Sequence, residues 1–250
     1  MSQLNKFFVS VIIPVYNGEA FLAEAIANIQ QQGHQPLEII IVDDGSTDQT
    51  AKIAAQYQEV VHYIYQANSG PSAARNRGIE IAQGNVITFL DVDDLWPENK
   101  LKSQLECLAK NSHVEIVQGK IQHLQIDAES QQSSIYRTLY DIGVSFNLGG
   151  AIFRKSVFDR IGLFDESLRY SEDVDWFMRA WEDKVSMIVL EEVMLLYRKH
   201  NSNMTNGRNI HTLDFIKVLK KSLDRRRKNG NTTAPQLSEL FKIYQSQSNL

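Results

Sequence analysis

The amino-acid sequence predicts an α/β fold with a mostly parallel sheet flanked by helices and a smaller, mixed second half. In the first half, four apolar and β-branched runs alternate with segments whose apolar residues stand three and four positions apart. These are the periodicities of buried strands and of helices. Such alternation produces right-handed crossovers and a parallel sheet covered on both faces. With 43% apolar content, the 250 residues suffice for a substantial core.

The first half supplies four strands and three helices in alternation. We expect strands at residues 8–15, 37–42, 60–65 and 85–90, and helices at 19–31, 48–57 and 71–82. In the first helix, for example, Phe21, Leu22, Ala25 and Ile29 fall on one face. Ligands of open parallel sheets bind outside the carboxyl ends of the strands. The polar residues that follow these strands are therefore expected along one edge.

The second half is less regular. We expect a helix at 101–110 after Pro97, a strand around 114–118, a polar loop at 127–134 and an extended segment at 146–153. Helices at 155–161 and 173–182 and strands at 185–189 and 193–197 follow. These elements predict one domain over residues 1–205, divided into halves at 101/102, and a C-terminal segment at 206–250.

The C-terminal segment contains a basic amphipathic helix. Its apolar stripe is formed by Leu213, Phe215, Ile216, Leu219 and Leu223. Beside the stripe stand seven basic residues: Lys217, Lys220, Lys221, Arg225, Arg226, Arg227 and Lys228. Two interpretations remain open, a surface helix docked by its apolar face or contact with an anionic membrane surface.

Composition excludes several classes of protein. The formal net charge of −4 offers no basic field for a nucleic-acid backbone, so no nucleic-acid partner is expected. Cys107 has no second cysteine to pair with, which fits a reducing compartment. No signal peptide begins the sequence, and every apolar run is shorter than the roughly 20 residues that span a bilayer. We expect a cytoplasmic protein of undetermined oligomeric state, with peripheral contact at the inner face of the membrane left open.

Two aspartates follow the fourth expected strand. Asp91 and Asp93, separated by Val92, come directly after the buried run. Carboxylates with this spacing can reach one point, and Mg²⁺ and Mn²⁺ prefer such oxygen donors. Negative charge at a sheet edge costs stability unless a cation or hydrogen-bond donors offset it. The pair therefore predicts a site for a metal-bound diphosphate.

Acidic residues also follow the second strand. Ser46 or Asp48 is expected to cap the next helix, because serine and aspartate are preferred at that position. This assignment leaves the carboxylates of Asp43 and Asp44 free to accept from a base N–H or a ribose hydroxyl. Tyr16, after the first strand, can stack on a base or simply pack.

An arginine lies one turn into the helix that begins at Pro71. Small residues precede Arg75, and a helix N-terminus beside an arginine attracts anions. The alternative is a solvated helix face. The small residues favour close approach of a ligand.

Four linked segments resemble family-2 glycosyltransferases of the GT-A fold, a Rossmann-like α/β architecture. They cover residues 11–17, 42–48, 70–76 and 89–94, in the order seen in that family. The resemblance is strong over about 8–101 and patchier to about 202. It implies that residues 1–101 form the nucleotide-binding half and residues 102–205 the acceptor half.

The resemblance implies roles for individual residues. A donor-binding set would comprise Pro14, Tyr16, Glu19, Asp43, Asp44, Arg75, Asp91 and Val92. Metal ligands would be Asp91, Asp93 and His200, the last in a closing segment at 197–202. Glu172 and Asp173 resemble the acidic pair that begins a helix in the acceptor half, with Asp173 as the catalytic base. Acidic residues are also favoured in the first turn of any helix, so capping is the alternative for this pair.

The function implied is a metal-dependent transfer of a sugar, with inversion, from a nucleotide-diphosphate sugar to an acceptor hydroxyl. The resemblance favours a UDP-sugar with Mn²⁺ or Mg²⁺, and a saccharide or lipid-linked saccharide acceptor in surface polysaccharide or glycoconjugate synthesis. A useful Asp173 requires a pKa raised towards neutrality by partial burial or by Glu172 and Asp175. Because the sequence lacks membrane spans and a Gln-x-x-Arg-Trp motif, we expect non-processive addition.

Three rival functions remain. A nucleotidyltransferase needs a phosphate-binding glycine-rich loop with a basic residue after the first strand, and residues 17–19 match this poorly. A dehydrogenase needs Gly-x-Gly-x-x-Gly there, which is absent. A non-catalytic sugar-nucleotide-binding module of the same fold differs only in lacking turnover, which the retained Asp91, Asp93 and Asp173 argue against.

Overall fold

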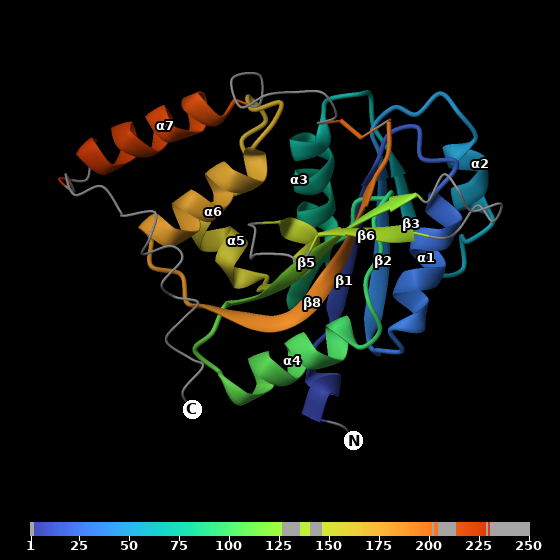
Figure 1. Cartoon of the computed structure of the whole chain (residues 1–250), viewed down its shortest axis with the longest axis horizontal. Helices are drawn as coiled ribbons and strands as arrows, with labels where there is room; N and C mark the ends of the chain where they lie inside the picture. The colour runs from blue at the N-terminus through green and yellow to red at the C-terminus, as the bar shows by residue number, and fades with distance from the viewer. Residues whose placement is uncertain are drawn as a thin grey trace.

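A computed structural model of the chain describes residues 3–126, 136–140, 147–201, 203–204, 214–228 and 230. The strands are β1 Val9–Val15, β2 Leu37–Asp43, β3 Val61–Tyr65, β4 Val86–Phe89, β5 Ile116–Ile126, β6 Tyr136–Tyr140, β7 Ala151–Arg154 and β8 Met187–Lys199. The α-helices are α1 Leu22–Gln31, α2 Thr50–Ala55, α3 Pro71–Ile81, α4 Lys100–Lys110, α5 Ser156–Ile161, α6 Glu172–Glu182 and α7 Phe215–Lys228 (Figure 1). Short 3-10 turns lie at η1 Gln3–Lys6 and η2 Leu148–Gly150.

All described strands belong to one sheet with a parallel half and a mixed half. The order is β3-β2-β1-β4-β7-β5-β6, and β8 pairs with β5. The pairs β1–β2, β1–β4 and β2–β3 are parallel, whereas β7 runs antiparallel to both β4 and β5. The fold class and the alternation predicted for the first half are confirmed.

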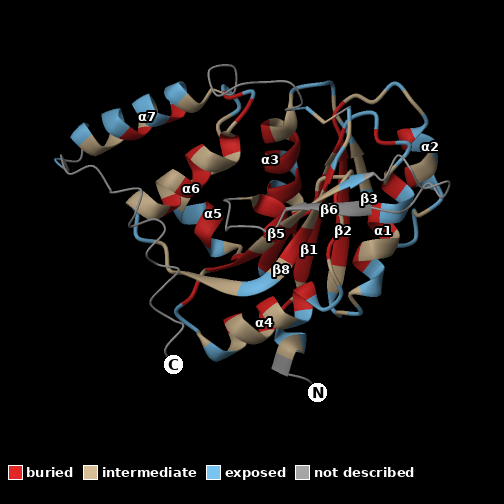
Figure 2. Cartoon of the chain, in the orientation of Figure 1, coloured by how far each residue is buried: buried red, intermediate tan, exposed pale blue. Residues whose placement is uncertain are grey.

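Helices cover both faces of the sheet and bury its apolar side chains (Figures 1 and 2). Side chains alternate across a strand, and in β1 this sends Val11 and Ile13 to one core and Ile12 to the other. The first core includes residues of α1, α2 and α4. The second includes residues of α3, α5 and α6. The sheet is thereby fixed as a rigid platform whose carboxyl edge can position polar groups.

The second half differs from the sequence prediction at its strands. The predicted strands 185–189 and 193–197 are one strand, β8, which passes through the exposed Glu191 and Glu192. These two residues look like a break in the sequence, but β8 is irregularly paired there and Glu191 forms an ion pair with Lys120 of β5. The strand expected at 114–118 continues to Ile126, and that at 146–153 begins only at Ala151, after η2. The predicted loop at 127–134 lies outside the described residues.

Helix α7 packs against α6, but not by the face that the sequence predicted. Its buried residues are Val218 and Ser222, whereas Ile216, Leu219 and Leu223 are 59%, 37% and 43% exposed. Docking by the apolar stripe is therefore wrong, and the physical reason is the acidic character of the surface that α7 meets. Leu213 lies outside the described residues. Within the described part of the chain, no helix is long and apolar enough to cross a bilayer.

Candidate active site

The carboxyl ends of the parallel strands gather the predicted site residues along one edge. Val15 at the end of β1 pairs with Asp43 at the end of β2, and Ile12 of β1 pairs with Phe89 of β4. Residues just beyond these ends, including Tyr16 and Asp91, therefore lie along the same edge. This edge, here called the rim, is the candidate active site.

At the end of β2, two buried carboxylates hold the surrounding loops. Asp43 accepts from the Ser46 N–H at 2.7 Å and from the Tyr63 hydroxyl at 2.6 Å. Asp44 accepts from the N–H groups of Ser69 and Gly70, both at 2.8 Å, and from the Gln66 amide at 2.8 Å. The expectation that these carboxylates are free is wrong. Backbone donors of a loop more than 20 residues away occupy Asp44, and the Ser46 N–H and the Tyr63 hydroxyl occupy Asp43.

The cap of α2 differs from the prediction, because the N-cap residue is Gln49, which makes no side-chain capping bond. Asp48 accepts from the Thr50 N–H at 2.9 Å, at the start of the helix. Ser46 does not cap it, since its hydroxyl accepts from the Asn17 N–H at 2.8 Å. The loop after β1 is thus tied to the loop after β2.

The loop after β1 carries the other predicted donor-binding residues. Tyr16 is 54% exposed, so its ring is open to a ligand. Glu19 accepts from the Gln49 N–H at 2.9 Å and thereby joins the two loops. Pro14 is half-buried in β1, and Val92 lies against Gly18, where an added Cβ would stand 3.2 Å from its methyl groups. Tyr16 is therefore the aromatic residue of this loop that a ligand can reach.

Arg75 links the two halves of the rim. Its guanidinium donates to Asp91 at 2.7 Å and to Glu172 at 2.5 Å. Burial opposes the charge, but the two carboxylates more than offset it and the pKa of Arg75 is raised. Its Nε is buried and has no partner among the described residues. The arginine therefore bridges the carboxylates of Asp91 and Glu172, which are 81 positions apart in the sequence.

Asp93 faces the segment that follows β8. Its Oδ2 lies 3.0 Å from His200 Nε2 and accepts from the Asn203 amide at 3.0 Å. His200 in turn stacks on Phe21 with ring centroids 5.0 Å apart. Burial, and then the nearby Asp91, raise the pKa of Asp93. The carboxylate thus lies where a further positive charge would stabilise it.

The donor set at Asp93 fits a hard divalent cation. Among the described residues, no three His, Cys, Asp or Glu side chains form a ready-made metal cage. Mg²⁺ and Mn²⁺ need few protein ligands when phosphates and water complete the shell. Asp93 and His200 already converge, and the side chain of Asp91 is 40% exposed. These residues fit such a cation through the chemistry of their donors.

Arg198 and Asp94 lock the metal-side loop in place. Arg198, 1% exposed, donates through Nε to the Asp93 carbonyl, pairs with Glu24 and stacks on Phe21. Its N–H donates to Asp94 at 3.0 Å. Burial, followed by Asp93 and Asp91, raises the pKa of Asp94 well above its ordinary value. Sequence reasoning missed Arg198, Asp94 and Asn203, although all three stand within or beside the motifs it singled out.

The first turn of α6 brings Glu172 and Asp173 to the rim. Ser171, before the helix, takes a left-handed conformation with φ 57°, which is uncommon for a residue other than glycine. Glu172 is held by Arg75, whereas the hydrogen bond of Asp173 among the described residues comes from the Val174 N–H at 2.7 Å. Burial, and then Glu172, raise the pKa of Asp173 to about 7. Asp175 instead pairs with Arg179 and Arg225.

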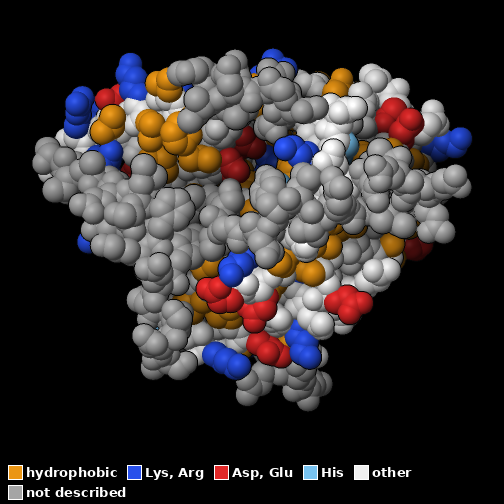
Figure 3. All heavy atoms as spheres, in the orientation of Figure 1, with side chains coloured by type: hydrophobic (Ala, Val, Ile, Leu, Met, Phe, Trp, Pro, Cys, Tyr) orange, Lys and Arg blue, Asp and Glu red, His pale blue; other side chains and the backbone are white. Residues whose placement is uncertain are grey.

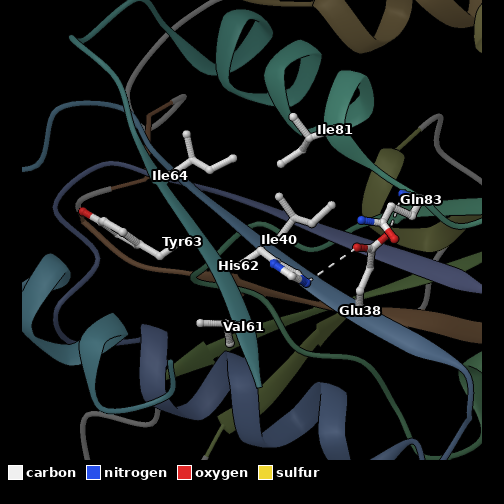
Figure 4. A pocket seen from close by; sticks show the side chains of 8 residues that line it. All are labelled: Glu38, Ile40, Val61, His62, Tyr63, Ile64, Ile81 and Gln83. Carbon is white, nitrogen blue, oxygen red and sulfur yellow. Dashed lines mark hydrogen bonds and ion pairs between the residues drawn. The ribbon is translucent and has the colours of Figure 1, made fainter. Parts of the chain in front are cut away.

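A pocket of about 380 Å³ lies elsewhere, near the opposite ends of β2 and β3 (Figure 4). Its polar residue Glu38 accepts from the N–H groups of Gln83 and Gly84 at 2.7 and 3.2 Å, and lies 3.9 Å from His62. These bonds hold the chain after α3. The pocket includes none of the rim residues, so we place the candidate site at the rim.

The sheet, its flanking helices and its acidic rim define a protein of the GT-A class. The model of the family described as glycosyl transferase family 2 matches residues 10–163. The chain belongs to this family.

Relatives from bacteria agree with this assignment. An uncharacterized glycosyltransferase of Rickettsia typhi is 33% identical over 212 residues, covering 79% of this chain and 66% of the relative. The putative teichuronic acid biosynthesis glycosyltransferase TuaG of Bacillus subtilis is 42% identical over 111 residues, 43% of this chain and 44% of TuaG. The chain thus spans just under two thirds of the length of the Rickettsia relative.

Solved structures share the fold. Residues 1–349 of TarS from S. aureus, in complex with UDP-GlcNAc, superpose with a TM-score of 0.70 at 23% identity, covering 86% of this chain and 65% of that one. The mannosyltransferase PcManGT from Pyrobaculum calidifontis, in complex with GDP-Man and Mn²⁺, gives a TM-score of 0.64 at 19% identity over 92% of this chain and 66% of that one.

Proposed function

We propose that the chain transfers a sugar from a nucleotide-diphosphate sugar to an acceptor hydroxyl with inversion, using Asp173 as the base. The observation that carries this proposal is the line of contacts Asp91–Arg75–Glu172, with Asp173 beside it at the rim. It joins the strand end that favours a diphosphate to the helix that carries a carboxylate with a pKa of about 7.

The proposed proton transfer follows from the state of Asp173. A carboxylate with a pKa near 7 is ionised in a large part of the molecules at neutral pH, yet is basic enough to accept a proton as the acceptor oxygen attacks. Glu172 cannot share this role easily, because its carboxylate is bound to Arg75 at 2.5 Å. One base and one displacement at the anomeric carbon give inversion of configuration.

We propose that residues 1–101 hold the donor and residues 102–205 the acceptor. The exposed Tyr16 would contact the base, while Asp43, Asp44 and Glu19 hold the loops that form its surroundings. The complexes of TarS with UDP-GlcNAc and of PcManGT with GDP-Man support a nucleotide-sugar donor and leave the base open. A UDP-sugar is our first candidate.

We propose that Asp91, Asp93 and His200 hold Mn²⁺ or Mg²⁺ together with the diphosphate of the donor. Such a cation stabilises negative charge on a departing diphosphate. The proximity of Asp93 to His200, at 3.0 Å, and the Mn²⁺ in the PcManGT complex support this assignment. Arg75 would add positive charge to the rim while its terminal nitrogens remain bound to Asp91 and Glu172.

Nucleotide release tests the proposal. A panel of UDP-, GDP- and other nucleotide-sugars is incubated with the chain in Mn²⁺, Mg²⁺ or EDTA, with and without saccharide acceptors. We expect release from one donor that depends on the cation and is lost in Asp93→Ala. Asp159→Asn, which changes an exposed aspartate of α5, is the matched control and retains the activity. Absence of binding to every donor would contradict the proposal.

A further inference from the structure

Helix α7 presents three apolar side chains away from the domain. Ile216, Leu219 and Leu223, here called the outer stripe, are 59%, 37% and 43% exposed. Their spacing of three and four residues puts them on one face of the helix. Figure 3 shows hydrophobic side chains beside basic ones over α7 at the upper left.

The opposite face of α7 docks through polar contacts. Arg225 pairs with Asp175 at 3.0 Å and with Glu182 at 2.8 Å, both on α6. Lys221 pairs with Asp165, and Ser222 donates to Glu182. Val218 is the buried apolar residue of this face. Because these contacts fix the rotation of α7 about its axis, the outer stripe cannot turn inward without breaking several ion pairs.

The outer stripe is accompanied by positive charge. Helix α7 carries seven basic residues against Asp224 alone as an acidic one. Lys220 and Arg227 stand on the same face as the stripe by helical spacing and are exposed. Among the described residues, neither forms an ion pair. Apolar side chains within a basic face are typical of helices that lie in the interfacial region of a membrane.

We propose that the outer stripe of α7, with Lys220 and Arg227, binds the surface of an anionic lipid bilayer. Charge complementarity favours this occupant, because negative headgroups attract basic residues near the surface. A second copy docked face to face would bring Lys220 and Arg227 of both chains together, and like charges repel. The docking of α7 on α6 links this surface to the helix that begins with Glu172 and Asp173. The inference does not depend on the proposed function, since binding is measured without turnover.

Co-sedimentation of the full chain with vesicles tests the proposal. Vesicles of phosphatidylcholine alone are compared with vesicles that also contain phosphatidylglycerol, at low and high salt. We expect binding to the anionic vesicles, weaker binding at high salt and none to the neutral ones. Lys220→Glu with Arg227→Glu should reduce the partition by roughly tenfold or more, and Leu219→Ser with Leu223→Ser should also abolish it.

Two controls separate the alternatives. Lys52→Glu reverses an exposed charge on α2 and should leave vesicle binding unchanged. Light scattering reports the oligomeric state of the wild type and of Leu219→Ser with Leu223→Ser. A wild-type dimer that the double variant dissociates, together with no vesicle binding, would assign the stripe to a second copy and overturn the proposal. Failure to bind vesicles as a monomer would overturn it as well.

Discussion

The two ends of the rim use the same residue type in different ways. At the end of β2, Asp43 and Asp44 are enclosed by donors from neighbouring loops. At the ends of β4 and at the start of α6, Asp93 and Asp173 lie close to other carboxylates and have raised pKa values. A carboxylate satisfied by protein donors supports the fold. One that burial and a neighbouring carboxylate destabilise in its charged form, as at Asp93 and Asp173, gains more from a cation or a proton.

Replacement of Asp173 should break this comparison most strongly. In Asp173→Asn, the group that accepts the acceptor proton is lost, and we expect turnover to fall by roughly 10² to 10⁴-fold. Donor affinity should stay within about twofold, because the uncharged amide keeps the shape of the side chain. Steady-state transfer and donor titration measure the two quantities. A collapse of donor affinity would show that Asp173 belongs to the donor site instead.

Shortening the bridge between the halves should have the next largest effect. In Arg75→Lys, one ammonium replaces a planar fork that reaches Asp91 and Glu172 together. Misplacement of the reacting groups by about 1 Å can cost on the order of 10²-fold in rate, and we expect a loss of that size in kcat. Arg77→Lys, at an exposed position on the same helix, is the matched control. Equal rates for the two variants would contradict the bridging role.

A substitution at the end of β2 should lower the free energy of unfolding. In Asp44→Asn, one acceptor oxygen is replaced, and at least one buried donor in the loop 66–70 loses its partner. Such a loss costs about 1–3 kcal/mol in the free energy of unfolding. Urea denaturation measures it, with Asp159→Asn as the control. An unchanged midpoint would mean that Asp44 is not part of the scaffold.

The smallest expected effect is on the pH dependence of the free energy of unfolding. It bears on the same comparison between the two kinds of carboxylate. A raised carboxyl pKa means that the folded state binds the proton more tightly than the unfolded state. The free energy of unfolding should therefore decrease as the pH rises from about 4 to about 7, the window set by the ordinary aspartate pKa and the pKa of about 7 for Asp173. Burial raises the pKa of Asp165, but its bonds to Lys221 and Ser167 outweigh this and lower the pKa to about 2. Asp165 therefore changes the free energy of unfolding only below this pH window.

Chemical denaturation at pH 5 and pH 8 measures this difference. The wild type should be more stable at pH 5 than at pH 8, and Asp173→Asn should show a smaller difference. If the variant keeps the full difference, other groups account for it.

The first half of the fold could be predicted because its local patterns agree with its tertiary structure. The runs at 8–15 and 37–42 are apolar except for Ser10 and Glu38, and they form the buried strands β1 and β2. In the second half, Glu191 and Glu192 interrupt the apolar pattern of β8. The strand accommodates them because, among the described strands, β8 pairs only with β5 in the sheet and because Lys120 of β5 pairs with Glu191. No local sequence pattern shows either feature.

The sequence predicted which residues lie at the candidate site better than it predicted the hydrogen bonds between them. The sequence brought Asp91, Asp93, Asp173 and His200 into one hypothesis, but their roles remain proposals. The donors to Asp44 are backbone N–H groups of Ser69 and Gly70, and backbone groups leave no signal in a sequence. The rotation of α7 was also beyond reach, because it depends on Asp175 and Glu182 of another helix.

The central claim, that Asp173 with its raised pKa is the base, is tested most directly by the pH profile of kcat/KM at saturating cation. The account predicts a rate that falls about tenfold per pH unit below an apparent pKa near 7, with this limb absent from the residual activity of Asp173→Asn. A profile that is flat between pH 5 and pH 8, or a limb that persists in the variant, would contradict it.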